Sequence, residues 1–355
     1  MHKKVALFVL ILFPYLLFSQ TPKYSNEFMN LGAGARALGM GNSQVAVVQD
    51  VTASYWNPAG LVNLKTKYEA SLMHAAYFAG IANYDYAGFA LKIDTLSALG
   101  ISGIRFGVDD IPDTRFLYDA DGRLNYQNVR YFSASDYGFL VSYARKATFL
   151  EGLRWGGSLK IIYRKAGDFA TAWGFGLDAG AIYQAKGWRF AAMARDVTTT
   201  FNMWAFNVSA LANTFLQTGN ELPSSSTEIT LPRLIIGTAK NFELNDKIHL
   251  LASLDLVNTF DGYRNEAIKT HIFSIAPQVG LEASYKQIVC LRAGVNNIQQ
   301  RLNDTNFNQK TITAQANFGL GIRLNNFVID YALAQMNLQQ QATYSHFFSL
   351  KLSFD

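Results

Sequence analysis

The stretch LRWGGSLKIIYR, residues 153–164, decides the fold class, because two kinds of side chain alternate along it. One set of alternate positions is mostly apolar or aromatic: Leu153, Trp155, Gly157, Leu159, Ile161 and Tyr163. The other set is more hydrophilic: Arg154, Gly156, Ser158, Lys160, Ile162 and Arg164. Successive side chains of a β-strand point to opposite faces, so this period of two predicts a strand with one oily face.

The same alternation recurs in residues 173–183, 247–256 and 312–324. A soluble β-sandwich also alternates, so strand length has to separate the two classes. Soluble strands usually have about 5–6 residues, whereas strands that cross a bilayer need roughly 9–11. Most segments here fit the longer class. Aromatic residues also lie near segment ends, where a membrane barrel has its interfacial girdles: Trp155, Tyr163, Trp173, Tyr183, Trp188, Tyr331 and Tyr344.

The fold class predicted is therefore all-β, a membrane-spanning antiparallel barrel of about fourteen strands. The expected strands start near Tyr68, Ala82, Ser97, Ser135, Leu153, Thr171, Trp188, Ile229, Lys247, Ala276, Ile288, Ile312, Phe327 and Thr343. Long loops are expected at 109–134, 198–228, 258–275 and 297–311, all at one end. Short turns are expected at the other end, at 94–96, 148–152, 185–187, 242–246, 286–287 and 325–326. The last strand ends at Phe354, one residue before the C-terminus.

Composition supports this class. Only 16% of the 355 residues are charged, against about 25% in soluble domains, and 14% are aromatic. The single cysteine, Cys290, excludes an internal disulfide framework. Basic residues are scattered through the strand-like segments, so no nucleic-acid partner is expected. No apolar stretch long enough for a membrane helix follows the N-terminal run.

The chain is expected to divide into a signal peptide (1–20), an N-terminal plug or hatch (21–67) and a transmembrane barrel (68–355). Lys3 and Lys4 precede an apolar run, residues 5–18, that is too short for a spanning helix. Cleavage near Ser19 or Gln20 and an integral outer-membrane location follow. No cysteine lies at this junction, which argues against a lipoprotein anchor. The alternative is an uncleaved N-terminal anchor.

The segment LGAGARALGMGNSQVAVVQDVTASYWNPAGL, residues 31–61, is rich in glycine and lacks sustained alternation. Glycine permits tight backbone paths, and Pro58 restricts Asn57 to extended conformations. A barrel of this size encloses a lumen, so we expect this segment to plug it. The alternative is a surface turn that leads into the first strand. The candidate plug residues are Asn57, Pro58, Ala59 and Gly60.

No catalytic, cofactor or metal site is expected. The five histidines lack metal-ligand spacing, and no nucleophile motif occurs in a suitable context. Asp109–Gly122 only partly matches a calcium loop, and a solvated acidic loop is the preferred interpretation. His249 and Asp255 lie six residues apart, roughly 20 Å along a strand, and cannot pair. Five cations are predicted to face the lumen: Arg154, Lys160, Arg164, Arg292 and Arg323. They suit an anionic pathway or, as we prefer, an ordinary hydrated interior.

Residues 31–61 resemble the N-terminus of the PorV/PorQ family of Bacteroidetes outer-membrane proteins and, more distantly, FadL-type fatty-acid channels. The matching residues are Gly32, Gly34, Arg36, Gly39, Gly41, Asp50 and the run Trp56–Leu61. Further matches are Val279–Glu282, Leu291–Val295, Gly319–Gly321, Asp330–Ala332 and His346–Leu350. FadL-like channels have an N-terminal hatch with an Asn-Pro-Ala motif, which corresponds to Asn57, Pro58 and Ala59 here.

The resemblance implies a FadL-like barrel associated with type IX secretion. Such a protein, in outer-membrane lipid, binds the C-terminal domains of secreted cargo, and translocon or attachment-complex proteins, at the cell surface. The alternative is a FadL-like channel for a hydrophobic small ligand. A lipid-modifying enzyme is a third class, but no nucleophile–base pair supports it. Fold alone does not decide among these.

Overall fold

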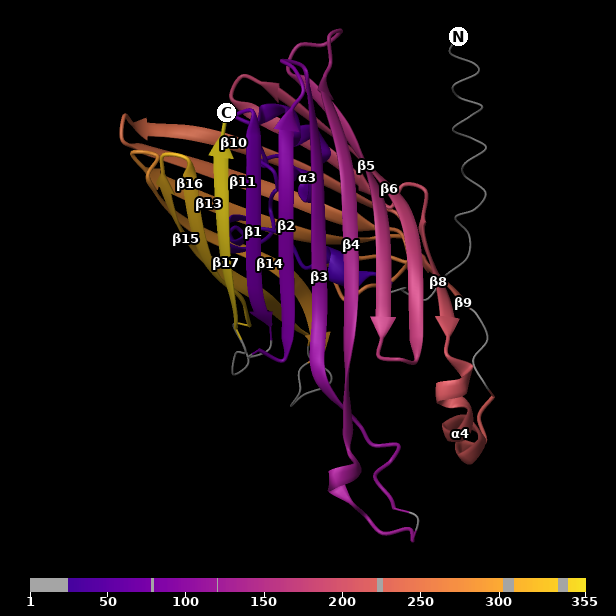
Figure 1. The fold of residues 1–355 in the computed structure, drawn as a ribbon. Helices are drawn as coiled ribbons and strands as arrows, with labels where there is room; N and C mark the ends of the chain where they lie inside the picture. The colour runs from indigo at the N-terminus through magenta and orange to yellow at the C-terminus, as the bar shows by residue number, and fades with distance from the viewer. Residues whose placement is uncertain (1–24, 78–79, 120, 222–225, 303–309, 338–343) are drawn as a thin grey trace, which may run out of the picture.

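The computed structural model describes residues 25–77, 80–119, 121–221, 226–302, 310–337 and 344–355. The signal peptide predicted over residues 1–20 and the strand start predicted at Thr343 lie outside these ranges. One antiparallel sheet contains all the described strands. Its first strand, β1 (Tyr68–Tyr77), pairs with β2 (Ala82–Lys92) on one side and with β17 (Ser345–Phe354) on the other. The sheet therefore closes into a barrel (Figure 1).

The remaining strands follow in chain order around the barrel. They are β3 (Ser97–Asp113), β4 (Arg130–Lys146), β5 (Leu153–Ala166), β6 (Ala170–Ala185), β7 (Trp188–Arg195), β8 (Thr200–Phe206), β9 (Ser226–Thr230), β10 (Arg233–Asn245), β11 (Ile248–Thr259), β12 (Ile268–Lys269), β13 (Ser274–Tyr285), β14 (Val289–Leu302), β15 (Lys310–Leu324) and β16 (Phe327–Asn337). All the strand pairings are antiparallel.

These elements make fourteen barrel strands, which confirms the sequence prediction. Both β7 and β8 pair with β6, while β7 pairs with β10 and β8 with β9. β7 and β8 together thus form one interrupted barrel strand, and β9 and β10 together form the next. The two-residue β12 only flanks β13. Fourteen is an even number, as expected for a single-chain bacterial barrel.

The seventh and eighth barrel strands are interrupted side by side. Asp196 and Thr199 between β7 and β8 have positive φ angles of 55° and 62°. Opposite them, Pro232 lies between β9 and β10 and has no N–H to donate. The hydrogen-bond ladder is therefore broken at this height of the wall.

The two ends of the barrel differ, as predicted. Connections such as 186–187 and 325–326 are short at one end, which we call the short-turn end. The long connections lie at the other, long-loop end; one carries the helix α4 (Val208–Thr218) (Figure 1). The predicted bounds 109–134, 198–228 and 297–311 are wrong, because strands continue into each of them. For example, β3 and β4 stay paired as far as Asp113 and Arg130 after the apolar alternation has stopped.

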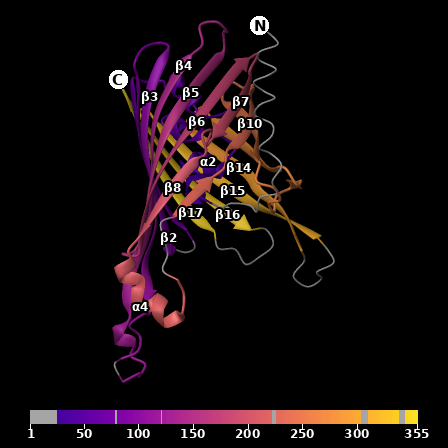
Figure 2. The same ribbon diagram turned by 90° about the vertical axis from the view of Figure 1, so that its right-hand side faces the viewer.

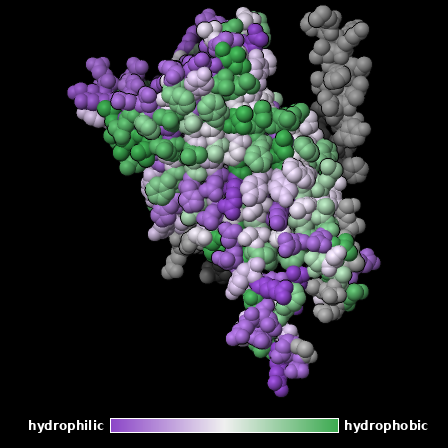
Figure 3. All heavy atoms as spheres, in the orientation of Figure 1, coloured by the Kyte–Doolittle hydropathy of each residue, from purple (hydrophilic) through white to green (hydrophobic). Residues whose placement is uncertain are grey.

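The outer face of the wall is oily. On β5, Trp155 and Leu159 are each 45% exposed, whereas Lys160, which points inward, is 3% exposed. Figure 3 shows a hydrophobic band across the wall and hydrophilic residues on the projecting hairpin. Aromatic rings pair across strands near both ends, for example Tyr163 with Trp173 and Tyr68 with Phe354. An apolar band with aromatic girdles is the surface that a lipid bilayer requires.

Residues 25–67 run through the interior of the barrel as a chain of short helices, which we call the inner segment. It comprises η1 (Glu27–Asn30), α2 (Ala35–Gly39), α3 (Ala53–Trp56) and η2 (Pro58–Asn63). Figures 1 and 2 place α3 and α2 within the outline of the barrel. The helix α2 packs on β14 to β17, and η2 packs on β3 to β6. In the described ranges, no helix combines the length and hydropathy of a membrane-spanning one.

Candidate functional site

The Asn-Pro-Ala motif ties the inner segment to the wall. Asn57 is extended and precedes η2, and its side-chain oxygen accepts a hydrogen bond from the Ala59 N–H at 3.2 Å. Its Nδ2 donates to the carbonyl of Val45 at 3.1 Å and to the carbonyl of Ala181, on β6, at 3.3 Å. Pro58 begins the helix, where its missing N–H costs nothing. The buried Asn57 amide therefore caps η2 and joins the inner segment to the barrel wall.

Glycines let the inner segment approach the wall closely. A Cβ on Gly156, in β5, would lie 2.9 Å from the Ala59 nitrogen. A Cβ on Gly294, in β14, would lie 2.2 Å from the Gly41 nitrogen, and Gly41 itself has a φ of +61°. Only residues without a Cβ fit where two backbones meet in this way.

Replacement of Asn57 by Ala is expected to loosen the inner segment. The loss of the cap and of two donated hydrogen bonds is worth about 2–3 kcal/mol, which is at least tenfold in the opening equilibrium. Limited proteolysis of the purified barrel, read by cleavage within residues 42–52, measures that opening. The matched control is Asn63→Ala in the same helix, because the buried Nδ2 of Asn63 has no hydrogen-bond partner. Equal cleavage rates in the two variants would contradict the role given to Asn57.

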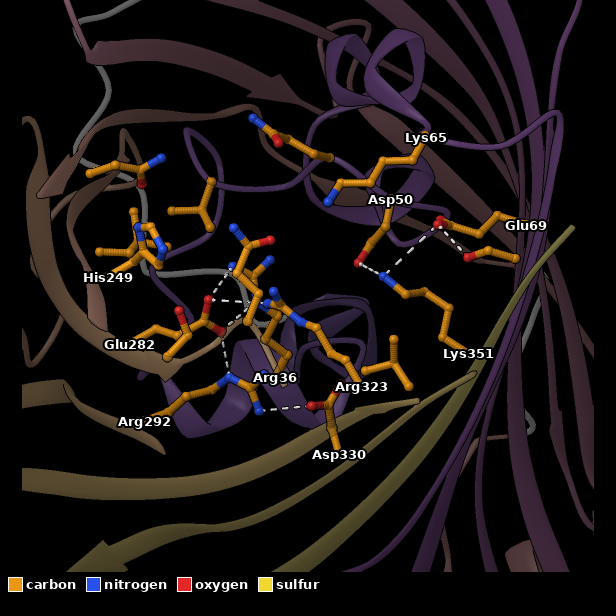
Figure 4. A pocket seen from close by; sticks show the side chains of 18 of the residues that line it. Arg36, Asp50, Lys65, Glu69, His249, Glu282, Arg292, Arg323, Asp330 and Lys351 are labelled. Atoms are coloured by element: carbon orange, nitrogen blue, oxygen red, sulfur yellow. Dashed lines mark hydrogen bonds and ion pairs between the residues drawn. The ribbon is translucent and has the colours of Figure 1, made fainter. Parts of the chain in front are cut away.

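Ion pairs join the inner segment to the wall at the short-turn end (Figure 4). Arg36 on α2 donates two hydrogen bonds to Glu282 on β13, from Nε at 2.8 Å and from Nη2 at 2.9 Å. Glu282 also accepts from Nε of Arg292 at 2.6 Å, and Arg292 reaches Asp330 at 2.8 Å. This buried chain of alternating charges links α2 to β13, β14 and β16.

A second cluster lies across the same space. Lys351 on β17 donates to Asp50 at 2.9 Å and lies 3.9 Å from Glu69 on β1. Burial raises the pKa of the Asp50 carboxyl, but Lys351, the Thr52 hydroxyl and Arg36 outweigh it and hold the pKa well below its ordinary value. Burial lowers the pKa of Arg36, but Glu282 more than offsets it and the pKa lies above the ordinary value. Both groups therefore remain charged at neutral pH.

A third anchor needs no cation. The Asp255 carboxylate, on β11, accepts hydrogen bonds from the backbone N–H groups of Gln44 at 2.6 Å and Val45 at 2.9 Å. In the sequence, Asp255 stands out only by its spacing from His249. The structure instead shows it holding a turn of the inner segment.

Between these clusters lies a polar cavity of about 470 Å³ at the short-turn end (Figure 4). Its charged lining consists of Arg36, Asp50, Lys65, Glu69, Arg189, Glu243, Glu282, Arg292, Arg323, Asp330 and Lys351. His249 also lines it. The cavity is lined by residues of both the inner segment and the wall. Any movement of the inner segment therefore changes the distances between its charged groups.

The five cations predicted to face the lumen are spread along the barrel from the short-turn end toward the long-loop end. Arg292 and Arg323 line the cavity, and Arg323 lies 3.5 Å from Glu282. Arg154 donates to the Gln184 amide at 2.7 Å, near the short-turn end. Lys160 pairs with Asp178 at 3.0 Å and Asp196 at 2.7 Å, beside the break in the wall. Arg164 pairs with Asp136 and Glu228 farther toward the long-loop end.

Five other charged residues with ion pairs in the site are not among the cations predicted to face the lumen. Arg36, Asp50, Glu282 and Asp330 appeared in the sequence only as members of the motifs that carry the family resemblance. Lys351 belongs to none of the sequence motifs, and only its position in the last strand could have indicated it.

Among the described residues, no group of three or more His, Cys, Asp or Glu side chains could hold a metal ion. In the loop likened to a calcium site, Asp119 accepts hydrogen bonds from the N–H groups of Asp121 and Arg123. That carboxylate therefore stabilises a turn of its own loop.

Comparison with solved structures identifies the fold of this chain. No family model and no curated protein sequence matches this chain. Among solved structures, the CymD monoaromatic hydrocarbon channel is similar at a TM-score of 0.59 with 15% identity, over 91% of this chain and 98% of that one. The chain has a FadL-like barrel fold.

Two further structures give the same fold. The Ralstonia pickettii toluene transporter TbuX has a TM-score of 0.54 and 14% identity, with 91% and 99% of the two chains covered. A Pseudomonas aeruginosa FadL homologue has a TM-score of 0.53 and 12% identity, with 95% and 99% covered. CymD is a channel and TbuX a transporter, and at this low sequence identity only the architecture carries over.

Proposed function

We propose that this protein is an outer-membrane channel for small hydrophobic molecules, with the inner segment as its movable plug. The observation that carries the proposal is the inner segment itself, which runs through the lumen and is held by hydrogen bonds and ion pairs such as Arg36–Glu282. Such bonds can break and re-form. The FadL-like fold of channels for monoaromatic hydrocarbons and toluene supports this class of substrate.

The long-loop end then faces outside and the short-turn end faces the periplasm, as in other barrels of this type. A molecule from outside meets the inner segment before it can pass. Transport therefore requires the segment to shift, and fixing it to the wall should stop transport.

A reversible cross-link tests this. The Ala35 N–H donates to the Ser349 hydroxyl at 3.2 Å, which places the inner segment and β17 close enough for a disulfide. In a Cys290→Ala background, Ala35→Cys with Ser349→Cys should abolish uptake of radiolabelled toluene by cells, and a reductant should restore it. The control pair is Ser142→Cys with Ser158→Cys, whose hydroxyls lie 2.8 Å apart within the wall. No uptake above an empty vector, or uptake by the oxidised Ala35–Ser349 pair, would refute the proposal.

A second function has its own support. The hairpin that continues β3 and β4 carries exposed aromatic side chains, with Tyr118 64% and Tyr126 74% exposed. We propose as the alternative that this surface docks secreted cargo or components of a type IX secretion system, as the PorV/PorQ resemblance implies. Affinity purification from detergent-solubilised membranes decides it: cargo lost upon Tyr118→Ser with Tyr126→Ser supports docking, and absence of such cargo contradicts it.

A further inference from the structure

The cavity at the short-turn end contains cations that its own carboxylates do not neutralise. Arg189, on β7, is only 6% exposed and lines the cavity. Its hydrogen bonds go to the Val47 carbonyl at 3.3 Å and to the Asn241 amide oxygen at 2.9 Å, both of which are neutral. Within the described ranges it has no ion pair. A buried guanidinium without a counter-charge is costly, so an anion would stabilise it.

Four of the five carboxylates that line the cavity already have partners, and one of these four, Glu69, accepts from the Val51 N–H. Glu282 accepts from both Arg36 and Arg292, Asp330 accepts from Arg292, and Asp50 accepts from Lys351. Arg323 has only a 3.5 Å approach to the occupied Glu282. The remaining carboxylate in the lining, Glu243, is exposed and has no ion pair in the described structure.

Two guanidinium groups in or beside the cavity also have unused N–H donors: Arg292, which lines it, and Arg154, which does not. The Arg292 side chain is 0% exposed, and its Nη2 has no hydrogen-bond partner. Gln184 on β6 is the cross-strand neighbour of Arg189, and its side-chain oxygen accepts a hydrogen bond from Arg154. Arg154 is also without a carboxylate partner among the described residues. Guanidinium groups bind oxyanions through paired N–H donors, which suits a carboxylate or a phosphate.

We propose that this cavity binds a small organic oxyanion, a carboxylate or a phosphate ester, through Arg189 and Arg323. The volume of about 470 Å³ leaves room for an organic portion beside the charged group. Its lining includes residues of the short turns, such as Gln287 and Asn326, so the ligand enters from the short-turn end. This inference does not depend on the passage of hydrophobic molecules.

Titration calorimetry on the purified full chain in detergent tests the site with three probes: inorganic phosphate, glycerol phosphate and succinate. Binding by at least one of them is expected. Arg189→Gln and Arg323→Gln should each weaken it at least tenfold, and Arg123→Gln, in the long-loop hairpin, should leave it unchanged. Preference for glycerol phosphate assigns a phosphate ester, and preference for succinate assigns a carboxylate.

The proposal fails if none of the three probes binds, or if Arg189→Gln and Arg323→Gln bind as the unaltered chain does. Heat-modifiable migration on gels confirms that each variant still forms a barrel. Because hydrocarbon uptake is a separate measurement, failure here leaves the channel proposal intact, and failure of uptake leaves this one intact.

Discussion

Replacing Glu282 by Gln is expected to free the inner segment from the barrel wall. Arg36 depends on this carboxylate and is left with an uncompensated charge when it is removed, whereas Arg292 keeps its ion pair with Asp330. Breaking a buried pair in this way costs about 3–5 kcal/mol. Opening of the segment should therefore increase by more than about a hundredfold. Proteolysis within residues 42–52 of the folded barrel reads this directly.

Two controls separate this effect from a general loss of charge. Glu243→Gln removes an exposed carboxylate from the same cavity and should leave cleavage unchanged. Combining Glu282→Gln with Arg36→Met removes the stranded guanidinium of the inner segment, so part of the loss should return. If Glu282→Gln alone leaves cleavage at the rate of the unaltered chain, the ion-pair chain does not hold the segment.

Replacing Gly294 by Ala is expected to prevent the inner segment from docking while the barrel still forms. The added methyl group would lie 2.2 Å from the Gly41 nitrogen and the Met40 carbonyl carbon. Both are backbone atoms, so no rotamer change can relieve the clash. The cost to docking is about 3 kcal/mol or more, at the upper end for overpacking. The disulfide between Ala35→Cys and Ser349→Cys should then form much more slowly.

The matched control is Gly103→Ala, also in a strand. Its added Cβ would face the ring of Phe139 at 3.5 Å, which is ordinary contact on the outer face of the wall. That variant should cross-link at the normal rate. Rapid cross-linking in Gly294→Ala would mean that the two backbones do not need to approach as closely as the structure has them.

The barrel could be predicted from the sequence because a lipid-facing strand requires apolar and hydrophilic residues to alternate along it. Strands start at Tyr68, Ala82, Ser97 and Leu153, as the alternation predicted. Where the environment changes, the pattern is lost. Around Asp113 and Arg130 the strands stay paired after the apolar alternation has stopped, so alternation does not predict where they end. The break near Pro232 was missed because alternation resumes on both sides of it.

The site was harder to predict because its partners are distant in sequence. Alternation identified Arg292 and Arg323 as inward-facing, but it carries no information about what lies opposite in the barrel. Arg36 and Glu282 are separated by 246 positions. Their pairing depends on the path of the inner segment, which has no periodicity to follow. The glycines at 39, 41, 294 and 319 marked that path, since each one allows backbones to touch.

The contacts between the inner segment and β17 also impose an order of assembly. Ala35 bonds to Ser349 and Asp50 to Lys351, so residues near the beginning of the chain are completed by residues from its last strand. These bonds cannot form until β17 has been made, and β17 closes the sheet by pairing with β1. Until β17 is in place, Ala35 and Asp50 lack these partners, so the inner segment gains its contacts with this part of the wall only late in folding.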